Sequence, residues 1–510
     1  MASALATEAT GAAREARLPA QRPVRTPTLL GAPLLLTMES LQRVRVRDPP
    51  HTSLPADNRR LYTTNPSVVA LPKHYRRSLR AVYLAVIKVQ NHHNCHRTMT
   101  RVPVPCVAML GFQLLDAHFR AAPAREALVR FGEKPADGTC GRTSFEDCRL
   151  VALDAWLLLV CKTIVQRVHV ALSDSTLAEA HYHCEPPLEC RQGASERWTQ
   201  SPTPQAPPRR GMQFVVSNAG LDLTLVGNQT HFATSEYFCG SSGRFCGKNF
   251  NLFVAPVEPE SDERGLYVER WVLGPWRHGP QSPTTHFAPP TIDRLVQVAG
   301  ARSSMSELEV RRRFPVFQAI RNPAKGSGRQ LHQVIPMKLA SSGLWEPEDG
   351  TMHSFEGYTM MGMTSPGKTG PKMPGTAHGG GCCVHIKADV SLGTPEVYVG
   401  VAHYHSAEYH YLQQFYAFRP EPPFDIFSLS DLFCFASPSG RRKSLLVHEN
   451  VTYPCSAIQM TMSIAHRAGD RSTLVFGVGM NDCEARLAQM HTRDVVQMLF
   501  AHPSQQLLPR

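Results

Sequence analysis

The residues best suited to chemistry in this chain are an acidic pair with an arginine close behind. Glu146 and Asp147 are followed by Arg149, within residues 145–150. A carboxyl group can hold and release a proton, as general acid–base catalysis requires. A guanidinium can donate two parallel hydrogen bonds to a phosphate or to sugar hydroxyls. The alternative is a structural salt bridge at a turn.

Other short polar motifs supply candidate substrate-binding residues. His403 and His405 alternate on an extended segment, so their side chains point to one face, where they could contact a phosphate or a diphosphate-sugar. Ordinary core or surface histidines fit the same pattern. The remaining candidates are Asn65, Lys248, Asn249, His378 and Asp482. Most of these lie in sequences typical of turns, so a purely structural role stays open for each.

The cysteines and histidines give no reason to expect a metal or a cofactor. Fourteen cysteines are present, but no pair of CxxC motifs is found. Cys382 and Cys383 are adjacent, a spacing that matches neither a zinc knuckle nor a redox pair. Histidine pairs two residues apart are common in a chain with 23 histidines. We therefore expect no bound metal and no cofactor.

Composition narrows the class of protein and of partner. The net charge of +12 and the pI of about 9.1 fit nucleic acid, an acidic membrane surface or a small anionic substrate. The basic residues are scattered, and the tightest cluster, residues 311–313, is short, which argues against nucleic acid. The sequence contains no run of about twenty uncharged apolar residues, so no transmembrane helix is predicted. The sequence does not decide between the secretory pathway or Golgi and the cytoplasm as the cellular compartment.

The elements that would position these residues are predicted to be strands. The 41 prolines and 35 glycines favour many turns and few long helices. Apolar runs that follow or adjoin the polar motifs predict buried strands, and these runs are residues 81–89, 156–161, 265–272, 396–403 and 472–479. We expect a short helix or an excursion within residues 112–130, and a turn at residues 65–67.

The spacing of these units suits the four-stranded blades of a β-propeller, an all-β fold in which motifs at strand ends share one central funnel. We expect three parts in the chain. Residues 1–58 are predicted to be a disordered leader, residues 59–500 a single domain with irregular loop insertions (one at about 185–210), and residues 501–510 a tail.

Five motifs, taken in order, resemble those of five-bladed β-propeller glycosidases, phosphorylases and glycosyltransferases. The group they resemble most is glycoside hydrolase family 130, with related eukaryotic β-mannosyl-transferring enzymes. The resemblance spans residues 60–500 as islands, and the five islands are residues 65–67, 145–149, 248–250, 398–403 and 477–482. It implies a five-bladed propeller.

The resemblance also implies roles for particular residues. Residues 146–149 are similar to the family's Glu-Asp-Pro-Arg segment, in which the aspartate is the proton donor; Cys148 stands where the family has proline. Asp147, with Glu146, would then be catalytic in an inverting transfer or cleavage of glycosyl groups, including β-mannosyl groups. The substrate would be a sugar, a sugar phosphate or a nucleotide sugar. The alternative is a propeller that binds glycans without catalysis.

Overall fold

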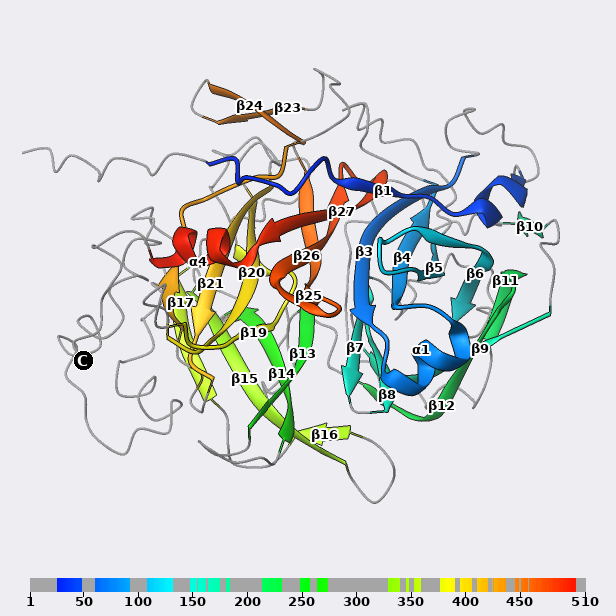
Figure 1. The fold of residues 1–510 in the computed structure, drawn as a ribbon, viewed down its shortest axis with the longest axis horizontal. Helices are drawn as coiled ribbons and strands as arrows, with labels where there is room; N and C mark the ends of the chain where they lie inside the picture. The colour runs from blue at the N-terminus through cyan, green and yellow to red at the C-terminus, as the bar shows by residue number, and fades with distance from the viewer. Residues whose placement is uncertain are drawn as a thin grey trace, which may run out of the picture.

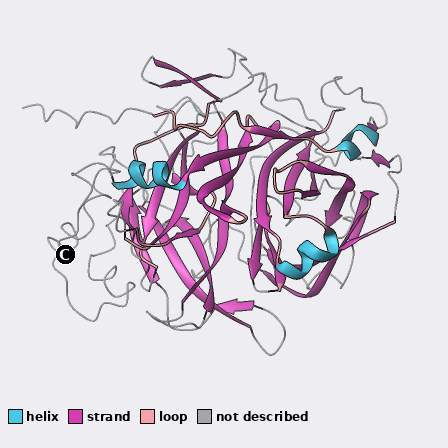
Figure 2. Ribbon diagram, in the orientation of Figure 1, coloured by secondary structure: helices cyan, strands magenta, loops and turns pink. Residues whose placement is uncertain are grey.

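The structure is a computed structural model in which strands dominate and helices are short (Figure 2). It describes residues 25–47, 60–91, 108–131, 147–153, 155–161, 164–174, 180–183, 213–231, 248–256, 264–273, 329–339, 345–347, 353–358, 377–389, 395–405, 411–420, 424, 426–436, 445–448, 451–456 and 458–500. The helices within these residues are η1 (Glu39–Arg43), α1 (Lys73–Leu79) and α4 (Thr492–Phe500).

Two antiparallel sheets come from the first half of the chain. The first sheet has the order β11-β6-β5-β4-β3 and the second the order β12-β9-β8-β7. The strands of the first are β3 (Tyr62–Ala70), β4 (Tyr83–Gln90), β5 (Ala108–Leu115), β6 (Ala121–Phe131) and β11 (Gln213–Ala219). Those of the second are β7 (Arg149–Leu153), β8 (Trp156–Val160), β9 (Ile164–Leu172) and β12 (Leu221–His231).

Two more antiparallel sheets follow in chain order. The third has the order β13-β14-β15-β16 with β17 also on β15, and the fourth has the order β18-β20-β21-β22 with β19 also on β20. The third contains β13 (Lys248–Pro256), β14 (Arg264–Leu273), β15 (Arg329–Leu339), β16 (Trp345–Pro347) and β17 (His353–Tyr358). The fourth contains β18 (Ala377–Gly379), β19 (Val384–Ile386), β20 (Val397–His405), β21 (Tyr411–Phe418) and β22 (Ile426–Leu429).

The fifth sheet joins the two ends of the described chain. Its order is β1-β27-β26-β25, so β1 pairs antiparallel with β27 (Figure 1). Its strands are β1 (Leu34–Leu36), β25 (Gln459–Arg467), β26 (Asp470–Met480) and β27 (Glu484–His491). Two small pairs complete the described strands: β2 (Val44–Arg47) with β10 (Ala180–His183), which is parallel, and β23 (Leu445–His448) with β24 (Val451–Ser456).

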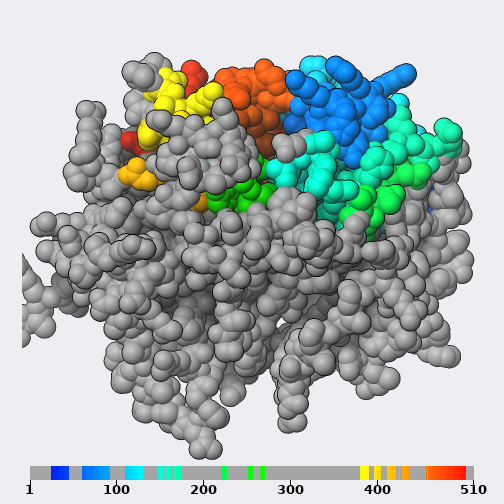
Figure 3. Space-filling model, turned by 90° about the horizontal axis from the view of Figure 1, so that it is seen from below, coloured from blue at the N-terminus to red at the C-terminus, as the bar shows by residue number. Residues whose placement is uncertain are grey.

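Each of the five large sheets contacts the next through strands at or near its edge. β3 contacts β7, β7 contacts β13, β13 contacts β18, β20 contacts β25, and β25 contacts β3. In the space-filling view, residues of the first sheet (blue) meet residues of the fifth (orange), although they are far apart in sequence (Figure 3). The polar residues carried by these strands are thereby brought toward one region.

Serine side chains tie neighbouring edge strands together. The backbone N–H of Val68 in β3 donates to Ser463 Oγ of β25 at 3.0 Å, and the N–H of Leu150 in β7 donates to Ser67 Oγ of β3 at 3.0 Å. All four residues are buried. A buried backbone N–H left without a partner would cost about 1–3 kcal/mol, so these bonds fix the approach of β3 to its two neighbours.

Two glycines allow β26 to pack closely on β3. A Cβ at Gly479 would overlap the side-chain oxygen of Asn65, and a Cβ at Gly477 would overlap the backbone oxygen of Pro66. The motif at residues 477–479 is therefore explained by contact between sheets.

Apolar side chains fill the space between the sheets. One buried cluster joins the first and second sheets with α1 and contains Leu79, Phe112 and Leu157. Another joins the fourth and fifth sheets with α4 and contains Phe415, Phe476 and Leu499. The strands between two such layers are apolar on both faces, as continuous apolar runs predict.

The predicted buried strands are confirmed as β4, β8, β14, β20 and β26, and the chain is all-β over its described residues. None of the described sheets closes on itself. The prediction of a helix or an excursion at residues 112–130 was wrong, because these residues form most of β5 and β6. The predicted turn at residues 65–67 was also wrong: it lies inside β3, where the register shifts between Thr64 and Ser67.

Part of the segment expected to be a disordered leader is ordered. Residues 25–47 hold β1, η1 and β2, and β1 is fixed by its pairing with β27. The predicted insert at 185–210 and the tail at 501–510 lie outside the described residues. No helix in the described part of the chain is long and apolar enough to cross a membrane.

Candidate functional site

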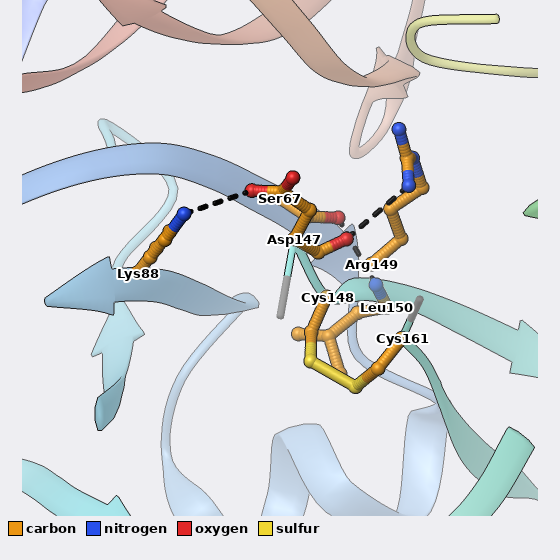
Figure 4. Close-up of a disulfide and its surroundings, with 7 residues drawn as sticks. All are labelled: Ser67, Lys88, Asp147, Cys148, Arg149, Leu150 and Cys161. Carbon is orange, nitrogen blue, oxygen red and sulfur yellow. Dashed lines mark hydrogen bonds and ion pairs between the residues drawn. A yellow bond between two sulfur atoms is a disulfide. The ribbon is translucent and has the colours of Figure 1, made fainter. Parts of the chain in front are cut away.

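Asp147 lies immediately before β7 and receives side chains from the first sheet. Its Oδ1 accepts a hydrogen bond from Asn65 Nδ2 of β3 at 2.9 Å and lies 3.5 Å from Lys88 Nζ of β4. The Asp147 side chain keeps 22% of its surface exposed and that of Lys88 12%. The carboxylate is thus held by an amide and an ammonium and still reaches solvent. The Lys88 contact is visible in Figure 4.

Three predicted site residues have left-handed backbone conformations. The φ angles are 49° at Asn65, 50° at Asp147 and 52° at Asp482, with 53° at the adjacent Asn481. Asparagine and aspartate tolerate this region better than other non-glycine residues, but it still costs about 1–2 kcal/mol. Such strain gathers where a structure must present a side chain in a fixed direction. These positions therefore hold residue types that tolerate a left-handed backbone conformation.

Arg149 is a buried cation behind Asp147. Only 4% of its surface is exposed, and its Nη1 donates to the Asp147 backbone oxygen at 3.2 Å (Figure 4). Burial lowers the pKa of Arg149 to about 10, against the opposing effect of the negative charges of Asp147 and Glu269. The guanidinium stays protonated at neutral pH, so it carries a full positive charge in a place with little water.

Glu269 is a site feature that sequence reasoning missed. It is fully buried in β14, where Oε2 accepts a hydrogen bond from Asn251 Nδ2 at 2.7 Å and Oε1 accepts one from the Tyr416 hydroxyl. Its charge acts on Arg149. The signal in the sequence was an acidic residue within a largely apolar strand, since buried acids are rare unless they are paired or bonded. Lys88 interrupts the run at 81–89 in the same way.

Tyr411 lies within reach of the charges of two carboxylates, Asp147 and Asp482. Burial raises the pKa of its hydroxyl, and the negative charges of Asp482 and Asp147 raise it further, so both carboxylates act on one phenol. Its ring stacks on that of buried His403, with centroids 5.5 Å apart and planes 25° apart. Asp482 follows β26, and its backbone oxygen accepts a hydrogen bond from Gln90 Nε2 at 3.2 Å. Residues in or next to β4, β7, β20, β21 and β26 thus lie in one region of the structure.

The structure brings together five of the predicted residues through the contacts above, and these are Asn65, Asp147, Arg149, His403 and Asp482. Lys248, Asn249, His378 and His405 lie in β13, β18 and β20, and only their backbone is described; His378 pairs with His403 in the register of β18 and β20. Glu146 lies outside the described residues. The chemical roles of all these residues stay predictions.

Cys148, which stands where the resembled family has proline, forms a disulfide with Cys161. The S–S distance is 2.00 Å, and both residues are buried. They flank the first pair of the β7–β8 ladder, where Arg149 lies opposite Val160. Figure 4 shows the disulfide between them. The bond fixes the chain directly after Asp147, a position where the backbone conformation is already unusual.

Three possible metal ligands meet at Glu269, whose charge acts on Arg149. The ligand atoms of Glu269, Cys382 and Cys383 all lie within 4.8 Å of one another. Sequence spacing gave no signal for it, because the carboxylate comes from a distant strand.

Chemically, the site combines an accessible carboxylate with two cations. Asp147 can exchange a proton with a bound molecule. Lys88 and Arg149 place positive charge on both sides of that carboxylate and can attract an anionic group. This combination suits transfer of a proton beside a negatively charged or hydroxyl-rich substrate.

Comparisons with known proteins give distant structural likenesses only. No family model matches the sequence, and no curated protein sequence matches it. One similar solved structure is a glycosyl hydrolase from Bacteroides ovatus, with 11% identity, a TM-score of 0.35 and coverage of 85% of each chain. Another is a β-1,2-mannobiose phosphorylase from Listeria innocua in complex with β-1,2-mannobiose. It has 10% identity and a TM-score of 0.33, and the match covers 86% of this chain and 92% of that one. Neither the fold nor the activity is inferred from values this low.

Proposed function

We propose that this chain is a carbohydrate-active enzyme that transfers or cleaves glycosyl groups, with Asp147 as its proton donor. The observation that carries the proposal is the setting of this carboxylate. Asp147 lies between Asn65 and Lys88, with Arg149 behind it, and it stays accessible. A carboxyl group so placed can protonate the bridging oxygen of a glycoside, and the cations can hold a phosphate or diphosphate.

We infer that the five large sheets are the blades of a five-bladed β-propeller. Support comes from the chain of contacts between neighbouring sheets, which runs from β3 through β7, β13 and the fourth sheet to β25 and back to β3. The pairing of β1 with β27 supports it further, because propellers gain by joining their first and last strands. The sequence motifs would then line one end of a central axis.

The proposed reaction inverts the configuration of the sugar. Asp147 delivers or relays a proton to the bridging oxygen as the glycosidic bond breaks, and the bonding electrons leave with the aglycone or phosphate. A phosphate, a water or a sugar hydroxyl attacks the anomeric carbon from the opposite face, as in other inverting enzymes. With Lys88 at 3.5 Å, Asp147 rests as one half of an ion pair, so it takes up a proton from solvent before it donates one to the bridging oxygen. When a water or a sugar hydroxyl attacks, the proton of that nucleophile is released to solvent. Mannosides are the substrates we expect from the sequence resemblance.

Turnover assays on the purified protein test the proposal. The full chain would be incubated with nucleotide sugars and with β-mannosides, each with and without inorganic phosphate. The Asp147→Asn variant retains an oxygen that can accept the Asn65 hydrogen bond, and it removes the transferable proton. We expect no turnover from this variant and unchanged sugar binding.

A matched control separates loss of chemistry from loss of fold. Asp174 is exposed near the end of β9, so Asp174→Asn makes the same chemical change outside the site and should leave turnover intact. Sugar binding by the wild type with no turnover on any donor would contradict the proposed activity and indicate a glycan-binding protein instead.

A further inference from the structure

The short helix α1 presents a cationic face to solvent. Lys73, Arg77 and the C-cap residue Arg80 are spaced i, i+4 and i+7, which places their side chains in one stripe, and Arg76 adjoins this stripe. All four side chains are exposed, and together they are called the α1 face below. The sequence contains no aspartate or glutamate from residue 58 to residue 115. The helix and its flanks in sequence therefore supply no carboxylate to neutralise these charges.

The opposite side of α1 fixes the helix to the body of the protein. Tyr75 and Leu79 are four residues apart, and both are buried in the apolar cluster that joins the first and second sheets. The Tyr75 hydroxyl lies 3.0 Å from His169 Nδ1 of β9, and Arg125 Nη1 of β6 donates to the Leu79 backbone oxygen at 2.6 Å. Because the inner side is held at several points, the cations of the outer side keep a common direction.

Strand β9 adds an exposed apolar side chain beside the helix. Leu172 keeps 41% of its surface exposed and follows the exposed His169 by three residues. At about 3.3 Å per residue, the two residues lie about 10 Å apart along the strand. Asp222 of β12 is an exposed acid opposite Ala171, so the positive charge is concentrated on α1 and not on this end of β9.

We propose that the α1 face docks the protein on a membrane surface rich in anionic phospholipids. Clusters of about four to eight Lys or Arg on one face of a helix are attracted by the phosphate and carboxylate groups of such lipids. The apolar side chains of α1 are buried in the protein, so the helix binds at the level of the head groups and does not insert. Leu172 is the exposed apolar side chain that enters the interface beside it.

The same features favour a lipid surface over a nucleic acid. Proteins that hold single strands stack the bases on exposed aromatic side chains, whereas the aromatic residue of α1, Tyr75, is only 5% exposed. Reading a duplex requires a helix that enters a groove. Helix α1 has 7 residues and its inner side is packed on the protein, and Arg76 Nε is bonded back to the Leu71 oxygen at 2.6 Å. A cationic surface of this kind suits a broad anionic plane.

Co-sedimentation of the full-length protein with lipid vesicles tests the proposal. Vesicles of phosphatidylcholine alone would be compared with vesicles of equal parts phosphatidylcholine and phosphatidylserine. We expect binding to the anionic vesicles only, and weaker binding as the salt concentration rises, because salt screens exposed charges. The Lys73→Gln/Arg77→Gln/Arg80→Gln variant should bind the anionic vesicles about 100-fold more weakly.

A matched variant separates the α1 face from the net charge of the chain. Lys387→Gln/Arg471→Gln/Arg493→Gln also removes one lysine and two arginines, all exposed, from the segment after β19, from β26 and from α4. It should bind the anionic vesicles within about twofold of the wild type, because these charges lie on other elements. Circular dichroism and urea unfolding of both variants would establish that each keeps the fold.

Three results would overturn the proposal. One is equal binding of the wild type to neutral and anionic vesicles, a comparison that needs no substitution. Another is an equal loss of binding in the two triple variants. The third is tighter binding of a short DNA or RNA duplex than of the anionic vesicles, which would assign the α1 face to nucleic acid. The face contains none of the candidate site residues, so the glycosyl proposal can fail while membrane binding stands.

Discussion

The disulfide between Cys148 and Cys161 should stabilise the fold and the candidate acid together. The two residues are 13 positions apart in sequence. In the chain-entropy description, cross-linking a loop of about 15 residues stabilises the folded state by about 3 kcal/mol. Both sulfurs are buried, so Cys148→Ala/Cys161→Ala removes the cross-link without leaving a polar group unpaired. We expect the free energy of unfolding to fall by about 3 kcal/mol.

Urea unfolding followed by circular dichroism measures this loss, and kinetics measure its effect on the site. Cys148 follows Asp147 directly, so we expect kcat to fall by roughly 10- to 100-fold as the carboxylate loses its fixed position. The matched variant is Cys434→Ala/Cys455→Ala, in which a similar cross-link spans 21 positions. It should lose a similar amount of stability and keep its kcat. Equal stability of the wild type and Cys148→Ala/Cys161→Ala would refute the reasoning.

Three further predictions concern single residues. Lys88→Met should lower kcat/KM about tenfold or more for phosphate-bearing substrates, because a cation beside Asp147 is lost, and less for neutral ones; steady-state kinetics that show equal effects would contradict this. Gly479→Ala should cost about 1–3 kcal/mol in urea unfolding, since its Cβ would overlap Asn65, and unchanged stability would count against the close packing. Burial raises the pKa of Glu126, so its folded form binds the proton more tightly than its unfolded form, and this stabilisation is lost as the pH rises through the raised pKa. The stability of the wild type relative to Glu126→Gln should therefore fall as the pH rises above about 4, and a difference in stability that does not change with pH would be the contrary result.

Strand predictions succeeded where apolar runs were long, and failed where packing overrides local preference. Residues 121–130 contain four alanines and two arginines, which favour helix, yet β6 is fixed by pairing with β5 on one side and β11 on the other. Residues 65–67 have the composition of a turn, yet they stay in β3 because β25, β26 and β7 pack against it. Both outcomes depend on partners distant in sequence, which local patterns do not contain.

Short sequence motifs indicated part of the candidate site, whereas charged residues outside those motifs could not be assigned to it from the sequence. Asn65, Asp147 and Asp482 belong to the residue types that a left-handed backbone tolerates, so their motifs stood out. Lys88 and Glu269 are charged residues within largely apolar strands, and only the three-dimensional contacts reveal what they act on. The contribution of Cys148 also depends on Cys161 across the ladder.

The most direct measurement is glycosyl turnover by Asp147→Asn beside the wild type and Asp174→Asn. Both variants would be assayed on the donor that the wild type uses, with sugar binding and circular dichroism recorded for each. We predict that Asp147→Asn binds the sugar, keeps its fold and loses turnover, while Asp174→Asn matches the wild type. Turnover by Asp147→Asn at the wild-type rate would contradict the assignment of Asp147 as the proton donor.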